Sequence, residues 1–143
     1  MIHFILILNR QGKTRLAKYY SAFSDAEKSL FKTQVHKLVA QREVKYFANY
    51  VEFKSYKIVY RRYAGLYFCF AVNLNDNELF YLEAIHLLVE VLDRFFKNVC
   101  ELDLVFNFYK VYAILDELFV GGEMLEMSKD VIMERLERLE KMD

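Results

Sequence analysis

The spacing of apolar residues changes near residue 78, and this change restricts the fold more than any other feature of the sequence. Before it, short runs rich in β-branched and aromatic residues are separated by turn-forming residues, which is typical of strands. After it, apolar residues recur every three or four positions, as on one face of a helix. Such a chain buries the apolar face of its sheet under its helices. The sequence therefore predicts an α+β fold.

Up to residue 77 the sequence predicts five strands and one helix. Ser24 and Glu27 have the spacing of a capping box, in which the serine side chain accepts from the helix backbone and the glutamate reaches back. The helix that they open should end near Arg42. The predicted strands are Ile2–Leu8, Thr14–Tyr20, Tyr50–Phe53, Lys57–Tyr63 and Leu66–Leu74.

The rest of the chain predicts three helices. The first begins at Glu78 and should run for roughly six turns, the second should stop at Gly121 and Gly122, and Ser128 can cap the third. Their apolar stripes run from Leu79 to Val99, from Leu104 to Leu118 and from Ile132 to Leu139. No break in composition appears, so we expect residues 1–143 to form a single domain: one five-stranded antiparallel sheet packed by helices, with C-terminal helices.

Composition points to burial, within the chain or against another one. Hydrophobic residues make up 55% of the 143 residues and aromatic residues 17%. This leaves two interpretations open: a dense two-layer core, or a large apolar surface covered by a permanent partner.

The zero net charge hides an asymmetry between the two parts of the chain. Residues 1–62 carry 13 Lys and Arg against 4 Asp and Glu, a balance of +9, and the remaining 7 and 16 give −9. The basic residues are spread along the first part rather than gathered in a tail. A charge-matched partner, or attraction between the two parts, therefore fits better than a nucleic acid.

The sequence contains no signal for export or for membrane insertion. Cys69 and Cys100 form no CxxC pair, so a reducing cytosol is the expected compartment. The apolar segment 1–8 is too short for a signal-peptide core, and no apolar run approaches the ~20 residues that span a bilayer. Any membrane role should therefore be peripheral.

Catalytic and cofactor patterns are also missing from the sequence. None of the three histidines lies in a metal or nucleophile motif, and no glycine-rich phosphate loop is present. Glu101 and Asp103 lie at a predicted helix start, where acids interact favourably with the helix dipole, so we do not interpret them as a catalytic pair. Tyrosines alternate with basic residues over 56–67, but without an RNP motif. We expect no enzymatic activity, no metal or other cofactor, and no nucleic-acid partner.

Two segments carry a resemblance to a known family. Residues 59–69 read VYRRYAGLYFC and residues 98–112 read NVCELDLVFNFYKVY. Both closely resemble the signature segments of the small (sigma) subunits of clathrin adaptor complexes, and residues 4–16 and 81–86 extend the similarity over nearly the whole chain. Residues 61–66 and 107–112 are most similar to the sigma chains of adaptor protein complex 2, the endocytic adaptor of the plasma membrane. The sigma chain of the Golgi and endosomal adaptor, or another longin-type vesicle-coat subunit such as a coatomer small chain, is the alternative.

The resemblance implies a longin-like fold and a function in recognition. In that family the sigma chain requires an alpha-type large subunit, assembles with a beta-type large subunit and a medium mu subunit, and is linked to clathrin only through the complex. It implies peripheral association with the plasma membrane at coated pits. With the alpha-type subunit it would bind acidic dileucine signals, [Asp/Glu]-x-x-x-Leu-[Leu/Ile], on the cytoplasmic tails of membrane cargo.

The resemblance also implies a set of site residues. Arg15 matches the cation that faces the acidic residue of the signal. Without the resemblance, the apolar members of the set would be interpreted as closed core; with it, we expect an open groove where a strand end meets two helices. The residues that match the lining of the leucine pockets are Ala64, Leu66, Val89, Asn98, Val99 and Leu104.

Overall fold

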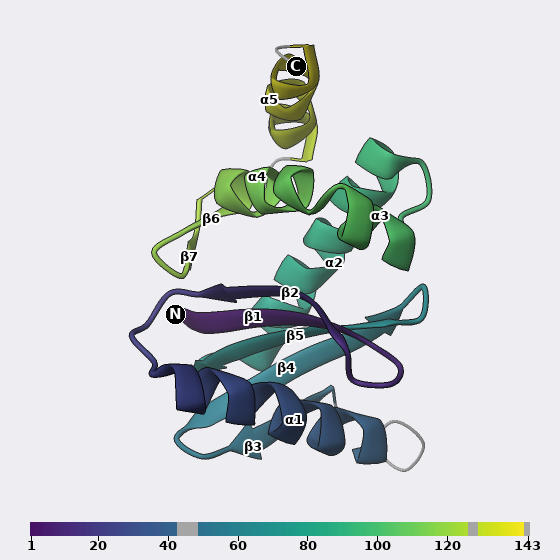
Figure 1. Ribbon diagram of the computed structural model, residues 1–143. Helices are drawn as coiled ribbons and strands as arrows, with labels where there is room; N and C mark the ends of the chain where they lie inside the picture. Colours follow the sequence, from purple (N-terminus) through teal and green to yellow (C-terminus); the bar gives the residue numbers. More distant parts are fainter. Residues whose placement is uncertain (43–48, 126–128, 142–143) are drawn as a thin grey trace.

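A five-stranded antiparallel sheet lies between two helical layers in the computed structural model, which describes residues 1–42, 49–125 and 129–141 (Figure 1). The strand order is β2-β1-β5-β4-β3. The sheet and its packed helices confirm the predicted α+β, longin-like class. The strands are β1 Ile2–Asn9, β2 Thr14–Tyr19, β3 Tyr50–Phe53, β4 Tyr56–Tyr63 and β5 Leu66–Asn73.

One face of the sheet is covered by α1 (Asp25–Arg42). Its predicted capping box is confirmed: the Glu27 amide donates to Ser24 Oγ at 3.1 Å, and the Ser24 amide donates to the Glu27 carboxylate at 3.0 Å. Phe31, on the buried side of this helix, stacks on Phe4 of β1 with ring centroids 5.4 Å apart. This aromatic contact fixes α1 on the sheet.

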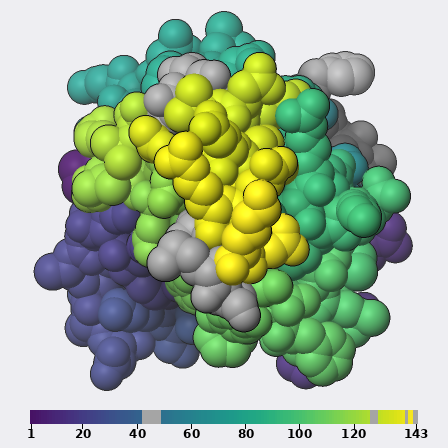
Figure 2. Space-filling view, turned by 90° about the horizontal axis from the view of Figure 1, so that it is seen from above, coloured from purple at the N-terminus to yellow at the C-terminus, as the bar shows by residue number. Residues whose placement is uncertain are grey.

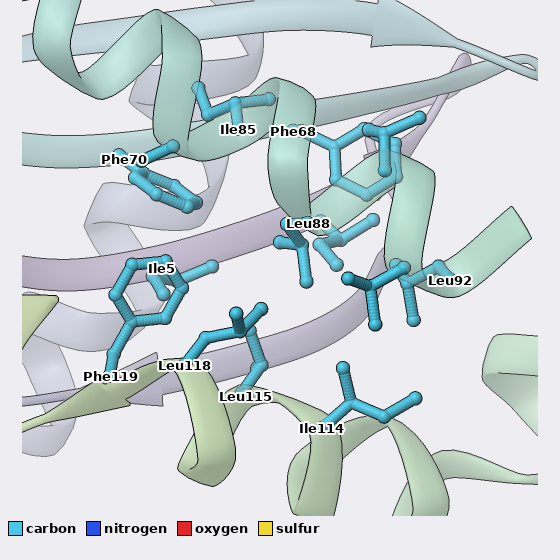
Figure 3. Close-up of a cluster of buried hydrophobic side chains, with 14 of the residues drawn as sticks. Ile5, Phe68, Phe70, Ile85, Leu88, Leu92, Ile114, Leu115, Leu118 and Phe119 are labelled. Atoms are coloured by element: carbon cyan, nitrogen blue, oxygen red, sulfur yellow. The ribbon is translucent and has the colours of Figure 1, made fainter. Parts of the chain in front are cut away.

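The other face carries α2 (Glu78–Phe96) and α4 (Phe108–Leu118). Phe68 and Phe70 of β5 point into this core, where the ring of Phe70 meets that of Phe119 edge to face at 5.5 Å (Figure 3). Each fully buried side chain of this kind contributes about 1.5–3 kcal/mol relative to exposure. The surrounding labelled residues are Ile5, Ile85, Leu88, Leu92, Ile114, Leu115 and Leu118.

A last helix, α5 (Lys129–Lys141), lies over the outer side of this layer, where it packs against α2 and α4 (Figure 2). Ile132 and Leu136 on its inner side are buried in the same core cluster. Ser128, the predicted cap, and the side chain of Leu139 lie outside the described residues. Among the described helices, none is both long and apolar enough to cross a bilayer.

The C-terminal half differs from the prediction at its helix ends. α2 ends at Phe96 rather than continuing to Val99, because Lys97 and Asn98 adopt left-handed φ angles of 55° and 76°. The chain therefore turns sharply, and Val99 reaches the core from a loop. The single helix predicted over 104–118 is two helices, α3 (Glu101–Phe106) and α4, separated at Asn107.

The paired glycines also have a different role from the predicted one. The helix has already ended at Leu118, and Gly121 and Gly122 form the turn of a small hairpin, β6 (Phe119–Val120) and β7 (Glu123–Met124). The Ile2 amide donates to the Gly122 carbonyl at 2.8 Å, which joins this hairpin to β1. A Cβ at Gly122 would lie 2.2 Å from the Ile2 carbonyl oxygen. Close approach of two backbones, rather than helix termination, explains this glycine.

Candidate functional site

The four large apolar residues of the predicted site lie together in the core on the α2 side of the sheet. Leu66 begins β5, Val89 is on α2, Val99 is in the α2–α3 loop and Leu104 is on α3. Their exposed fractions are 0%, 5%, 3% and 1% respectively. The groove that we expected to be open is closed in the described chain, because all four side chains are buried in one core cluster, out of contact with water.

The other three predicted residues form the rim of this cluster. Ala64 and Asn98 are exposed and Arg15 is partly exposed. Ala64 and Gly65 make the two-residue turn between β4 and β5 with φ angles of 53° and 75°, since positive φ at both positions matches the twist of the hairpin. A non-glycine residue in this conformation costs about 1–2 kcal/mol. Asn98, the other exposed residue of the rim, also has a left-handed backbone conformation.

A carboxylate that the sequence interpretation missed holds one side of the site. Asp93, in the last turn of α2, accepts a hydrogen bond from the Val99 amide at 3.0 Å and another from the Tyr63 hydroxyl. Its backbone carbonyl accepts from the Asn98 amide at 2.9 Å. The hydrogen bond to Asp93 raises the pKa of Tyr63, so the phenol stays protonated and continues to donate. Asp93 therefore ties the α2–α3 loop to the end of β4.

A second carboxylate holds the opposite side. Glu101, the first residue of α3, accepts from Arg15 Nε at 2.9 Å and from Asn9 Nδ2 at 2.8 Å through the same oxygen. These hydrogen bonds, from Asn9 first and Arg15 second, hold the pKa of Glu101 below its usual value. Arg15, predicted to face a ligand's acid, is thus already paired with an acid of this chain.

Asn9 determines where this second carboxylate is bound. It is 6% exposed, and its Oδ1 accepts from the Gln11 and Lys13 amides of the β1–β2 turn at 3.0 and 2.8 Å. Because the oxygen is used in this way, the amide nitrogen must point toward Glu101. Asn9 also lies opposite Leu66 in the β1–β5 pairing. The ion pair therefore lies directly beside the cluster of four buried site residues, named here the apolar floor: Leu66, Val89, Val99 and Leu104.

The outer side of α3 and the start of α4 expose a group of large apolar residues, named here the α3–α4 patch. Phe106 is 71% exposed and Phe108 55% exposed. Single exposed apolar residues are ordinary, but several on adjacent turns mark an interaction surface. The patch consists of Leu102, Val105, Phe106, Phe108 and Tyr109.

Sequence reasoning found the apolar floor and Arg15 but missed the two residues that position them, Asn9 and Asp93. A turn signal around Gly12 pointed to Asn9, whereas nothing local pointed to Asp93, whose partners lie on other elements. Among the described residues, no group of His, Cys, Asp and Glu is placed to hold a metal ion. The residues that the structure brings together are therefore a buried apolar cluster with a charged edge.

The sequence model of a known family, described as clathrin adaptor complex small chain, matches residues 1–143. The chain belongs to this family. Its relatives include the AP-2 complex subunit sigma of Neurospora crassa, 66% identical over 143 residues and covering 100% of both chains. The AP-2 complex subunit sigma of Dictyostelium discoideum is 63% identical over 142 residues and covers 99% of both.

Two further matches place this clathrin adaptor small chain within its wider family. The AP-1 complex subunit sigma-2 of Dictyostelium discoideum is 53% identical over 131 residues, covering 92% of this chain and 84% of that protein. A chain of a structure titled "Homology model of the full-length AP-3 complex in a stretched open conformation" has a TM-score of 0.77 and 32% identity. It covers 99% of this chain and 95% of that one. The predicted resemblance to sigma subunits is thereby confirmed.

Proposed function

We propose that this chain is the sigma subunit of the endocytic clathrin adaptor and that, with an alpha-type large subunit, it binds acidic dileucine signals of membrane cargo. The observation that carries the proposal is identity along the full length to proteins named AP-2 complex subunit sigma, 66% in Neurospora crassa and 63% in Dictyostelium discoideum. The AP-1 sigma-2 subunit of the second organism is less similar, at 53%. This difference favours the plasma-membrane adaptor over the Golgi and endosomal one.

The surface of the chain supports assembly with large and medium subunits. The α3–α4 patch leaves side chains such as Phe106 in water, where burial against another chain would be favourable. An exposed apolar surface of this kind fits a permanent interface better than a transient one, because permanent interfaces resemble a core cut in half. Clathrin and the membrane would then be reached through the complex, at coated pits of the plasma membrane.

The site supports the acidic dileucine assignment by its chemistry. Once uncovered, the floor of Leu66, Val89, Val99 and Leu104 would offer aliphatic contacts, and Arg15 at its edge, now paired with Glu101, would offer a guanidinium that can bind a carboxylate. Burying two leucines yields at most about 3–6 kcal/mol before ordering costs. An exposed Arg–carboxylate contact adds about 0.2–1 kcal/mol. Together these contributions reach at most about 7 kcal/mol, so one site should bind no more tightly than about 10 μM, and several complexes on one membrane would raise the affinity by avidity.

Affinity purification tests the assembly part of the proposal. The tagged chain should recover an alpha-type large subunit, a beta-type large subunit and a mu subunit, identified by mass spectrometry, and co-expression with the alpha-type subunit should increase its solubility. A stable monomer that recovers no large subunit would contradict the proposal. Imaging of the tagged chain in cells distinguishes the two adaptors. Puncta at the cell cortex support the plasma-membrane adaptor, and location at internal membranes supports the Golgi and endosomal one.

A further inference from the structure

Glu101 forms an ion pair with Arg15, the residue that the acidic side chain of a cargo signal would need to bind. Its ion pair with Arg15 joins α3 to β2, and the same oxygen is held by Asn9, whose orientation is imposed by the β1–β2 turn. The carboxylate stays ionised over a wider pH range than usual, because these hydrogen bonds lower its pKa. An incoming carboxylate must therefore compete with an acid that is already in place.

The position of Glu101 in the chain connects this competition to the leucine site. It lies between Val99 and Leu104, which are only 3% and 1% exposed. Leucine side chains of a peptide cannot reach these two residues while segment 99–104 stays in its present position. Both anchors lie at the start of the segment: Asp93 accepts from the Val99 amide, and Arg15 and Asn9 hold Glu101 beside β2 and β1.

We infer that the Arg15–Glu101 ion pair is a latch that keeps the leucine site closed, and that Glu101 thereby sets the dependence on an acidic residue in the signal. A carboxylate that binds Arg15 replaces Glu101 and frees α3 to move off the apolar floor. A neutral signal must break the same ion pair without forming a new one with Arg15. This inference rests on the proposed function for its cargo, but the latch itself is a property of this chain.

Peptide binding by the assembled complex tests the inference. Glu101→Ala should tighten binding of both an acidic dileucine peptide and its Gln-substituted form by about two- to fivefold, the value of one exposed ion pair. Glu101→Gln, which keeps the size of the side chain, should have a smaller effect in the same direction. Asp116→Asn is the matched control, since Asp116 on α4 pairs with Lys18 on the same edge strand and should leave both affinities unchanged. If Glu101→Ala does not tighten the neutral peptide, the inference is wrong.

Hydrogen exchange without peptide provides a second test that does not depend on cargo. In the complex, Glu101→Ala should speed amide exchange over residues 102–106, and Arg15→Ser should do the same, because it breaks the ion pair from β2 without altering α3. Unchanged exchange in Arg15→Ser would refute the latch even if Glu101→Ala frays the helix. A wild-type complex that binds neither peptide would refute the proposed function instead, and the exchange result would still decide the latch.

Discussion

Removal of the Asp93 carboxylate should release the α2–α3 loop. In Asp93→Ala the Val99 amide and the Tyr63 hydroxyl each lose a charged acceptor. Hydrogen bonds to charged groups contribute about 1.5–3 kcal/mol each, and both donors regain some water here, so we take the lower end, about 3 kcal/mol for the pair. Loss of a negative charge from a helix C-terminus returns about 0.3–1 kcal/mol. The net cost is about 2 kcal/mol.

The Val99 amide reports this change directly, because its hydrogen bond is the one removed. A cost of about 2 kcal/mol corresponds to roughly 30-fold faster hydrogen exchange, when opening and closing are fast. The measurement is exchange by mass spectrometry or NMR on the chain assembled with its large subunit.

Two variants serve as controls for this prediction. Asp93→Asn keeps an acceptor for the Val99 amide and a polar partner for Tyr63, so its exchange should stay close to that of the wild type. Glu117→Ala removes a partly exposed acid of α4 that pairs with Arg135 at 3.7 Å, and it should not affect the loop. Equal loss of protection in the Asn and Ala variants, or none in the Ala variant, would refute the reasoning.

Three further predictions concern the apolar floor, its rim and the β6–β7 hairpin. Leu104→Ser should destabilise the chain by about 3 kcal/mol and abolish dileucine-peptide binding, and Val99→Ser should also abolish binding. The control Leu88→Ser should destabilise the chain similarly but leave binding intact. Binding is measured by fluorescence anisotropy on folded complexes, and loss of binding in all three variants would mean that the pocket is elsewhere. Arg15→Ser should weaken binding of acidic peptides several-fold, more at low salt, without weakening neutralised ones, and equal weakening of both would make its role structural. Gly122→Ala should lower the free energy of unfolding by more than ~1 kcal/mol, because the new Cβ meets the Ile2 carbonyl oxygen and φ at this position is 85°. An unchanged melting temperature would show that the hairpin can shift to accommodate the Cβ.

Most of the individual helices and strands could be predicted from the sequence, because each depends on contacts between near neighbours. The capping box of Ser24 and Glu27 spans three residues, and the strand and helix periods extend over single elements. Such interactions form within one segment, so they do not depend on how the rest of the chain packs. The resemblance to sigma chains then pointed to Arg15 and to the four residues of the floor as a binding site, whereas periodicity alone predicted closed core for those four, which is how they lie in the described chain.

The tertiary structure decided how the site is held and whether it is open. Asp93 meets Tyr63 across 30 positions of sequence, and Glu101 meets Arg15 across 86 and Asn9 across 92. The end of α2 at Phe96 likewise depends on Lys97 and Asn98 accepting a left-handed backbone that the helical period of their neighbours does not reveal. Local sequence cannot indicate which distant charge a carboxylate will meet, because that pairing exists only after the sheet and its helices have packed.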